Sequence, residues 1–152
     1  MPRNTTFFDD LEVGDRLAAD GYLMTEAEIV EFGGKFDPRP IHTDPTAARQ
    51  SLFGGLIASG IHTLAAWNRL RFQAEDGLAM LAGLGLDEVR YAAPVRPGDR
   101  LSLRAECIEK TPSASKPDRG IMRFRHVLTN QRGEETMSLA SIMMVARRPA
   151  DS

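Results

Sequence analysis

Asp37 and His42 are two side chains suited to acid–base chemistry, and they lie five residues apart in the proline-rich segment 36–43, FDPRPIHT. A carboxylate and an imidazole that hold one water molecule can take a proton from it and return that proton elsewhere. Because five extended residues span roughly 17 Å, the two side chains can cooperate only if the segment folds back. Spacing alone leaves a second interpretation open, in which Asp37 shapes a turn and His42 bonds to the backbone.

Ser59 and Gly60 begin a long apolar segment and could add a hydrogen-bond donor to such a site. Ser59 is a suitable N-cap residue for a helix. The N–H of Gly60 would then be an unpaired donor of the first turn, and such a donor can hold the oxygen of a thioester enolate. Gly54 and Gly55 lie just before this point, and glycine lets a substrate approach the backbone closely. The alternative is that these glycines only turn the chain.

The elements that must position these residues divide the chain into a helical half and a half made of strands. In the helical half we expect a strand over 15–24, a helix over 26–32 and an irregular loop over 36–43. A short helix should follow from Pro45, capped by Asp44. We expect a long helix over 59–73 that is buried on most sides. Thr25 and Glu28 form a capping box at the start of the first helix, and Gly33-Gly34 stops it.

The second half alternates apolar and polar residues with a period of two, which is typical of strands. The expected strands cover 84–95, 100–109, 121–130 and 135–145. A long buried helix followed by an antiparallel meander predicts an α+β fold in which the sheet wraps around the helix. A small curled sheet leaves an edge, so we also expect a dimer that extends the sheet.

The composition of the chain argues against several classes of protein. The 152 residues suit one domain over 1–152, and 42% hydrophobic with 26% charged residues argues against a disordered chain. A net charge of −2 gives no reason to expect nucleic acid or an anionic membrane as a partner. The single cysteine, Cys107, excludes an internal disulfide framework and a cysteine-rich zinc site. The start resembles no signal peptide and the apolar run 56–67 is too short to span a bilayer, so we expect a cytoplasmic protein.

Two segments carry a resemblance to a known family. FDPRPIHTDP, residues 36–45, followed by FGGLIASG, residues 53–60, resembles the hydratase motif of the MaoC-like dehydratases, a hot-dog-fold family that includes (R)-specific enoyl-CoA hydratases. The family pattern is an aspartate, a proline-containing loop, a histidine five residues on and a glycine at the start of the hot-dog helix. Asp37, His42 and Gly60 match it in type and spacing. Weaker similarities, at 7–15 and 95–99, extend the resemblance over nearly the whole chain.

The resemblance implies a hydro-lyase of fatty-acid metabolism. Asp37 and His42 would activate a water that adds to Cβ of a 2-enoyl-CoA thioester. One of the two, with His42 favoured, would help to move a proton at Cα. The Gly60 N–H would polarise the thioester carbonyl. The reverse reaction dehydrates a 3-hydroxyacyl-CoA. The resemblance implies no metal and no redox cofactor, with coenzyme A entering as part of the substrate. It also implies a homodimer or higher homo-oligomer with the acyl pocket near the subunit interface.

The chain departs from the family pattern at three positions. Arg39 stands where many hydratases carry a small polar residue, and it could alter the charge beside the pair or bind an acidic acyl group. Ser59 stands where a histidine often precedes the helix glycine, and Asn68 where some members have serine. We expect Arg39, Gly55, Ser59 and Asn68 to bind substrate. Asn68 would line the acyl tunnel, or alternatively be a core polar group satisfied by the backbone.

Two other functions are compatible with the same fold, because a fold does not fix a function. An acyl-CoA thioesterase of this fold tends to have a carboxylate on or near the central helix. Here 60–73 contains no acidic residue, and Glu75 comes only at its end. A non-catalytic acyl-CoA binding domain would be favoured by a closed pocket.

Overall fold

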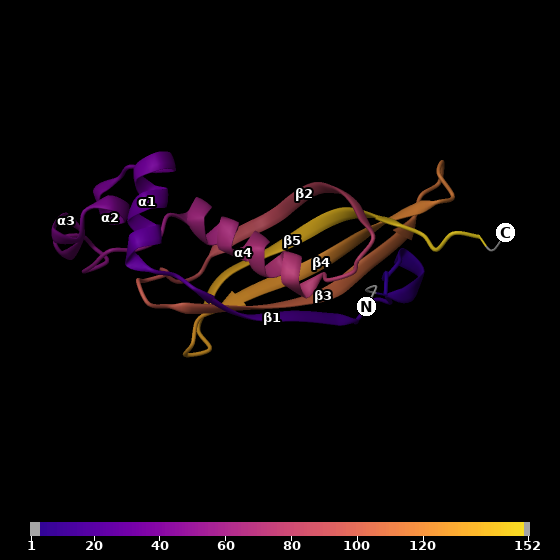
Figure 1. Ribbon diagram of the computed structural model, residues 1–152, viewed down its shortest axis with the longest axis horizontal. Coiled ribbons are helices and arrows are strands. Elements are labelled where there is room, and N and C mark those ends of the chain that lie inside the picture. Colours follow the sequence, from indigo (N-terminus) through magenta and orange to yellow (C-terminus); the bar gives the residue numbers. More distant parts are fainter. Residues whose placement is uncertain (1–3, 151–152) are drawn as a thin grey trace.

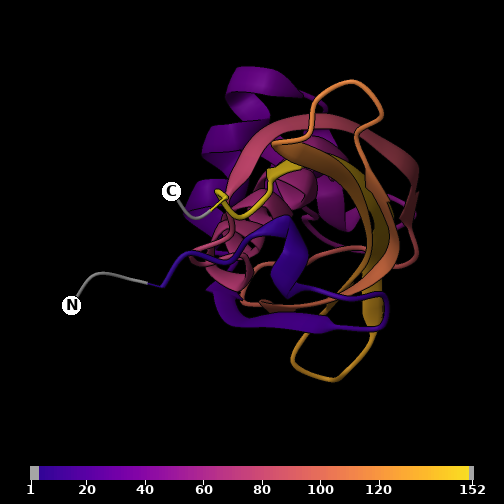
Figure 2. The ribbon, with the colours of Figure 1, turned by 90° about the vertical axis from the view of Figure 1, so that its right-hand side faces the viewer.

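A curled antiparallel sheet and one long helix make up most of the computed structural model, which describes residues 4–150 (Figure 1). The sheet has the strand order β1-β3-β4-β5-β2. Its strands are β1 (Arg16–Leu23), β2 (Met80–Tyr91), β3 (Arg100–Pro112), β4 (Arg119–Thr129) and β5 (Glu135–Ala146). Viewed end-on, the sheet bends around α4 (Gly60–Ala74), which confirms the expected α+β architecture (Figure 2).

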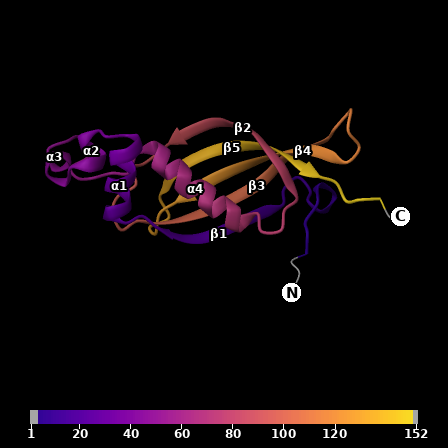
Figure 3. The same cartoon turned by 45° about the horizontal axis from the view of Figure 1, so that its top comes forward.

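The short helices gather beyond one end of the sheet, next to the N-terminus of α4 (Figures 1 and 3). They are α1 (Glu26–Phe36), α2 (Pro40–Thr43) and α3 (Pro45–Arg49), preceded near the chain start by the single 3-10 turn η1 (Phe8–Asp10). Asp44 caps α3 as expected, because its carboxylate accepts from the N–H groups of Thr46 and Ala47.

Two expectations about this helical region are wrong. The first is that Gly33-Gly34 ends α1, which instead continues to Phe36. The second is that 36–43 is irregular, because Pro40–Thr43 form α2. Pro40 keeps Arg39 in an extended conformation, and its fixed φ suits the first position of a helix, so α2 starts at this proline.

The strand β2 lies four residues earlier at each end than expected, at 80–91 rather than 84–95. Residues after Tyr91 leave the sheet because Val95 is engaged elsewhere: its carbonyl accepts from the Ala58 N–H at 2.8 Å, just before α4. The other strands begin within two residues of their expected positions. In the last strand, Met137, Leu139 and Met143 are buried.

The core lies between α4 and the inner face of the sheet. Trp67 and Leu70 pack there against Leu101, Leu103 and Leu128. The expectation that α4 is buried on most sides is wrong, because Ile61 is 55% exposed and Phe72 69% exposed. The helix therefore covers the sheet with one face and leaves an apolar face uncovered.

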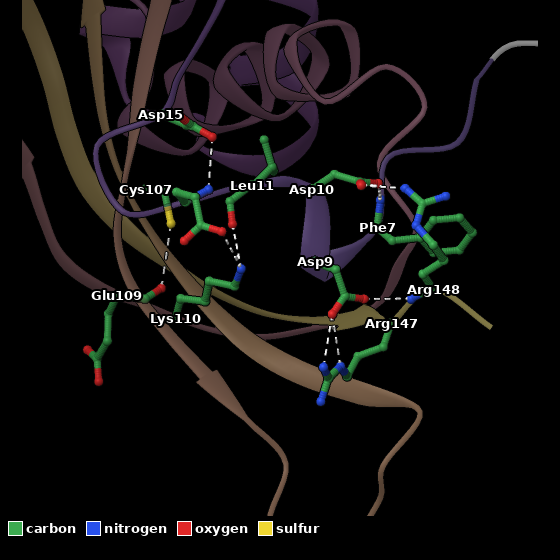
Figure 4. A network of polar contacts seen from close by, with 11 residues as sticks. Phe7, Asp9, Asp10, Leu11, Asp15, Cys107, Glu109, Lys110, Arg147 and Arg148 are labelled. Carbon is green, nitrogen blue, oxygen red and sulfur yellow. Dashed lines mark hydrogen bonds and ion pairs between the residues drawn. The ribbon is translucent and has the colours of Figure 1, made fainter. Parts of the chain in front are cut away.

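A second part of the core closes the far end of the sheet, and polar contacts beside it join segments near the two ends of the chain (Figure 4). Phe8 fills this end, and Lys110 lies over its ring. Asp9 pairs with Arg147, with 2.9 Å between Oδ1 and Nη2, and Asp10 contacts Arg148. These contacts hold the turn η1 on the last strand, at the opposite end of α4 from the short helices.

Residues 4–150 contain neither a membrane-spanning helix nor a cluster of metal-binding side chains. No described helix is long and apolar enough to cross a membrane. Within the same residues, no three His, Cys, Asp or Glu side chains are grouped so that they could hold a metal ion.

Candidate active site

Asp37, His42 and Gly60 come together where three helix ends meet. Asp37 is the C-cap of α1, and its N–H donates to the Gly33 carbonyl at 2.8 Å. His42 lies in the single turn of α2, and Gly60 is the first residue of α4. Because α2 reverses the chain after Asp37, five residues of sequence are enough to bring the carboxylate and the imidazole face to face.

Asp37 is only 8% exposed, and its carboxylate has three side-chain partners. Its Oδ2 accepts from the Ser59 hydroxyl at 2.7 Å and lies 3.4 Å from Nε2 of His42. Its Oδ1 contacts the guanidinium of Arg39. Hydrogen bonds from neighbouring side chains thus help to hold a charged carboxylate in a buried position.

The hydrogen bonds of His42 set its tautomer. Its Nδ1 lies 2.8 Å from the backbone carbonyl of Ile57, which can only accept. The proton of a neutral His42 is therefore on Nδ1, and Nε2 carries a lone pair. That lone pair and Oδ2 of Asp37 are two acceptors 3.4 Å apart, an arrangement that favours a shared proton donor such as a water molecule.

The Ser59 hydroxyl lowers the pKa of Asp37 below its ordinary value, against the opposing effect of burial, and Arg39 and His42 contribute in the same direction as Ser59. Asp37 is consequently a carboxylate throughout the neutral range. Ser59 occupies the N-cap position of α4 as expected, but its side chain makes no capping bond. Its hydroxyl is directed to Asp37 instead, because the two helix ends face each other.

Replacing Ser59 with alanine tests this arrangement through the pKa of Asp37. Loss of the strongest pKa-lowering contact should raise the pKa of Asp37 toward its ordinary value. The carboxylate form exists above the folded-state pKa. On acidification the Ser59→Ala variant should therefore lose the Asp37 carboxylate at a higher pH than the wild type does. Carbon NMR titration of the Asp37 carboxyl measures this shift directly. An identical titration in both proteins would contradict the assigned role of Ser59.

Gly33 allows α1 to approach α2 closely enough to form the site. A Cβ atom at position 33 would lie 2.8 Å from the His42 carbonyl oxygen and 3.0 Å from its Cβ. The neighbouring Gly34 has open space around it and belongs to the same helix. Gly33 is thus retained in a helix interior for contact with His42, despite the entropic cost of glycine there.

The two glycines form a matched pair for mutation. Gly33→Ala should displace α2 and lower activity at least about tenfold, because small misplacements of reacting groups are costly. Gly34→Ala should stabilise the protein by about 0.5–1 kcal/mol, and its activity should equal that of the wild type. Thermal unfolding and kcat for both variants check this, and equal activity of the two would contradict it.

A pocket of about 510 Å³ opens beside these residues. Its walls include His42, Gly60, Phe53 and Tyr91. The N–H of Gly60 belongs to the first turn of α4, where N–H groups have no carbonyl partner within the helix and the dipole favours negative charge. The pocket walls are mostly apolar, with Ile57, Ala58, Ala92, Ala93, Pro94 and Val95 as further members.

The other residues expected to bind substrate are placed differently. The side chain of Arg39 is 73% exposed and next to Asp37. Gly55 lies in the loop between Phe53 and Ile57 but is not part of the pocket wall. The expectation that Asn68 is a polar residue among buried positions is wrong. Asn68 is exposed and lines a separate groove of about 550 Å³ between α4 and β2.

Sequence reasoning missed several contributors to the site. The Ile57 carbonyl orients His42, and no side-chain pattern signals a backbone acceptor. Tyr91 lines the pocket from β2, thirty-one residues beyond Gly60 in the sequence, and no motif surrounds it. Glu28 joins α1 to α4, because its carboxylate lies 3.0 Å from Nε2 of the buried His62. Only half of the expected capping box is present: the Thr25 hydroxyl accepts from the Glu28 N–H, whereas the Glu28 carboxylate bonds to Tyr22 and His62.

An antiparallel sheet curled around a long helix is the architecture of a hot-dog domain, and here an aspartate, a histidine and the helix N-terminus meet at one end of it. Residues 11–126 match the model of the MaoC like domain, and the chain belongs to that family. The expected resemblance is thereby confirmed. The solved MaoC-like dehydratase from Rhodospirillum rubrum is 42% identical, with a TM-score of 0.87 over 95% of this chain and 99% of that one.

Two curated relatives are more distant. The uncharacterised protein YdeM of Bacillus subtilis is 30% identical over 112 residues, which is 71% of this chain and 77% of YdeM. The 3-hydroxyacyl-thioester dehydratase Z of Mycobacterium tuberculosis is 36% identical over 86 residues, which is 55% of this chain and 57% of that protein.

Proposed function

We propose that this protein adds water to a 2-enoyl-CoA thioester to give a 3-hydroxyacyl-CoA, and catalyses the reverse dehydration. The main observation behind this proposal is that Oδ2 of Asp37 lies 3.4 Å from Nε2 of His42. The pair lies beside a pocket that is also lined by Gly60, the first residue of α4. Membership of the MaoC-like family and similarity to a 3-hydroxyacyl-thioester dehydratase support this reaction class.

In the first step, a water held by Oδ2 of Asp37 and Nε2 of His42 attacks Cβ. His42 accepts a proton from the water as the new C–O bond forms, since Nδ1 is already committed to Ile57. Asp37 stays ionised and stabilises the imidazolium that forms. The electron pair of the Cα–Cβ double bond moves toward the thioester carbonyl oxygen.

In the second step, the enolate takes up a proton at Cα. The negative oxygen is held by the Gly60 N–H at the positive end of α4. The His42 imidazolium returns its proton to Cα, which restores the neutral imidazole and completes addition of one water molecule. The steps use only groups of the chain, and coenzyme A enters with the substrate. We also propose that the enzyme acts on these thioesters in the cytoplasm.

A thioesterase has less support from this geometry. Glu75, the acidic residue nearest to α4 in sequence, caps the C-terminus of the helix and pairs with Arg71. Fifteen helical residues separate it from the pocket at Gly60, a distance of about 22 Å. The expected carboxylate is thus at the wrong end of the helix to act on a thioester bound near His42.

The functional unit in this proposal is a homodimer. The strand β2 is an edge of the described sheet and runs alongside α4 (Figure 3). Side chains of the two elements line a mostly apolar groove. Ile61, Leu84 and Leu86 in that groove are all more than a third exposed. A second copy paired along β2 would bury this surface and remove the edge. Sedimentation as a monomer at assay concentration would contradict this part of the proposal.

The test is the absorbance of the conjugated enoyl thioester, followed with crotonyl-CoA and with a longer and a branched enoyl-CoA. Loss of absorbance without release of free thiol is the expected result. Release of free coenzyme A thiol would instead identify a thioesterase. Stoichiometric binding of all three thioesters with no turnover would identify a binding domain, and either of these outcomes overturns the proposal.

A further inference from the structure

Tyr91 lies directly over the residue that begins α4. A Cβ atom placed on Gly60 would be 2.8 Å from Cζ of Tyr91 and 3.1 Å from its hydroxyl oxygen. Tyr91 ends β2, so the sheet carries the phenol across to the N-terminus of the helix. The hydroxyl group is therefore held next to the Gly60 backbone, on the wall of the pocket that contains His42.

The Tyr91 hydroxyl has no hydrogen-bond partner among residues 4–150, and the residue is 53% exposed. The second tyrosine of the chain differs in this respect. The hydroxyl of Tyr22 donates to the Glu28 carboxylate at 2.5 Å and is thus committed within the protein. Burial raises the pKa of Tyr91 above its ordinary value, so its phenol keeps its proton at neutral pH and remains a donor.

We propose that the Tyr91 hydroxyl is a second hydrogen-bond donor to the thioester carbonyl oxygen, beside the N–H of Gly60. This inference rests on the proposed hydration of an enoyl thioester. In that reaction the carbonyl oxygen gains negative charge when water adds to Cβ, and pre-positioned donors that strengthen as charge develops accelerate such a step. Tyr91 donates a hydrogen bond and transfers no proton.

The same contact accounts for glycine at position 60. Any side chain there would occupy the space now filled by the phenol, so the residue must be glycine for Tyr91 to reach the helix N-terminus.

Tyr91→Phe removes the hydroxyl and keeps the ring. We expect kcat for crotonyl-CoA to fall about tenfold, with KM within about twofold and an unchanged melting temperature, because one hydrogen bond to developing charge is lost and solvent can replace it in part. A folding defect would lower the melting temperature, which separates it from a loss at the site.

A spectroscopic measurement tests the donor independently of turnover. In the Asp37→Asn background, bound 2,4-hexadienoyl-CoA should show a red-shifted absorbance band, because polarisation of the carbonyl extends into the conjugated chain. The shift should decrease when Tyr91→Phe is added. A packing role for the ring alone would leave the shift unchanged.

The outcomes separate this inference from the proposed function. A wild type that hydrates crotonyl-CoA, together with a Tyr91→Phe variant of equal kcat and equal red shift, overturns the assignment of Tyr91 and leaves the hydratase proposal standing. A wild type that neither hydrates the thioester nor shifts the dienoyl spectrum overturns the proposed function, and the role of Tyr91 with it.

Discussion

The Asp37→Asn variant is expected to hydrate crotonyl-CoA with a kcat about 10³-fold below that of the wild type. Asparagine keeps the size of the side chain and can still accept from the Ser59 hydroxyl, so the fold should persist. It brings no negative charge to stabilise the His42 imidazolium. In the opposite orientation its amide N–H₂ takes the place of Oδ2, gives up the Ser59 contact and donates to Nε2 of His42, which occupies the lone pair that should accept the proton of water.

Asp44→Asn is the matched control, because it makes the same chemical change seven residues away. Asp44 caps α3, a role that asparagine fills as well. Steady-state kinetics on the three proteins, with circular dichroism to verify folding, provide the comparison. A kcat for Asp37→Asn within twofold of the wild type would remove the carboxylate from the mechanism.

The Gly60→Ala variant should lose about 10² in kcat/KM without loss of stability. The new methyl group would stand 2.8 Å from Cζ of Tyr91, so the ring must move away, and the methyl would project into the pocket where the carbonyl oxygen must meet the N–H. Alanine is otherwise favoured over glycine in a helix. A melting temperature at or above that of the wild type should therefore accompany the loss of activity.

Gly34→Ala serves again as the comparison, since it adds the same methyl to a helix at a place with no neighbour within 4 Å. If Gly60→Ala hydrates crotonyl-CoA as fast as Gly34→Ala, the N-terminus of α4 does not receive the substrate carbonyl.

The sequence predicted the fold class and the three central residues because their signals are local or carried by a motif. The alternation along 100–109 identifies a strand without knowledge of its partner, and Asp37, His42 and Gly60 keep a spacing that a known family shares. Asp44 was recognised as a cap because an N-cap needs only the next three residues.

The features that were missed depend on contacts between distant parts of the chain. Gly33 was interpreted as a helix stop, although the structure shows that it makes room for His42. Ser59 was expected to cap its own helix, but Asp37, twenty-two residues earlier, is its partner. The exposure of Asn68 follows from which face of α4 meets the sheet. Polar residues are spread around this helix, with Thr63 and Arg71 on its buried side, so the sequence does not specify that face.

The measurement that tests the account most directly is the mass of the acyl thioester after incubation of crotonyl-CoA with the wild type and with His42→Ala. The account predicts a product heavier by one water molecule for the wild type, and no product above the uncatalysed level for His42→Ala at equal protein concentration and equal folded content. Formation of the hydrated product at the same rate by both proteins would contradict it, because the water would then be activated without the imidazole that the structure places beside Asp37.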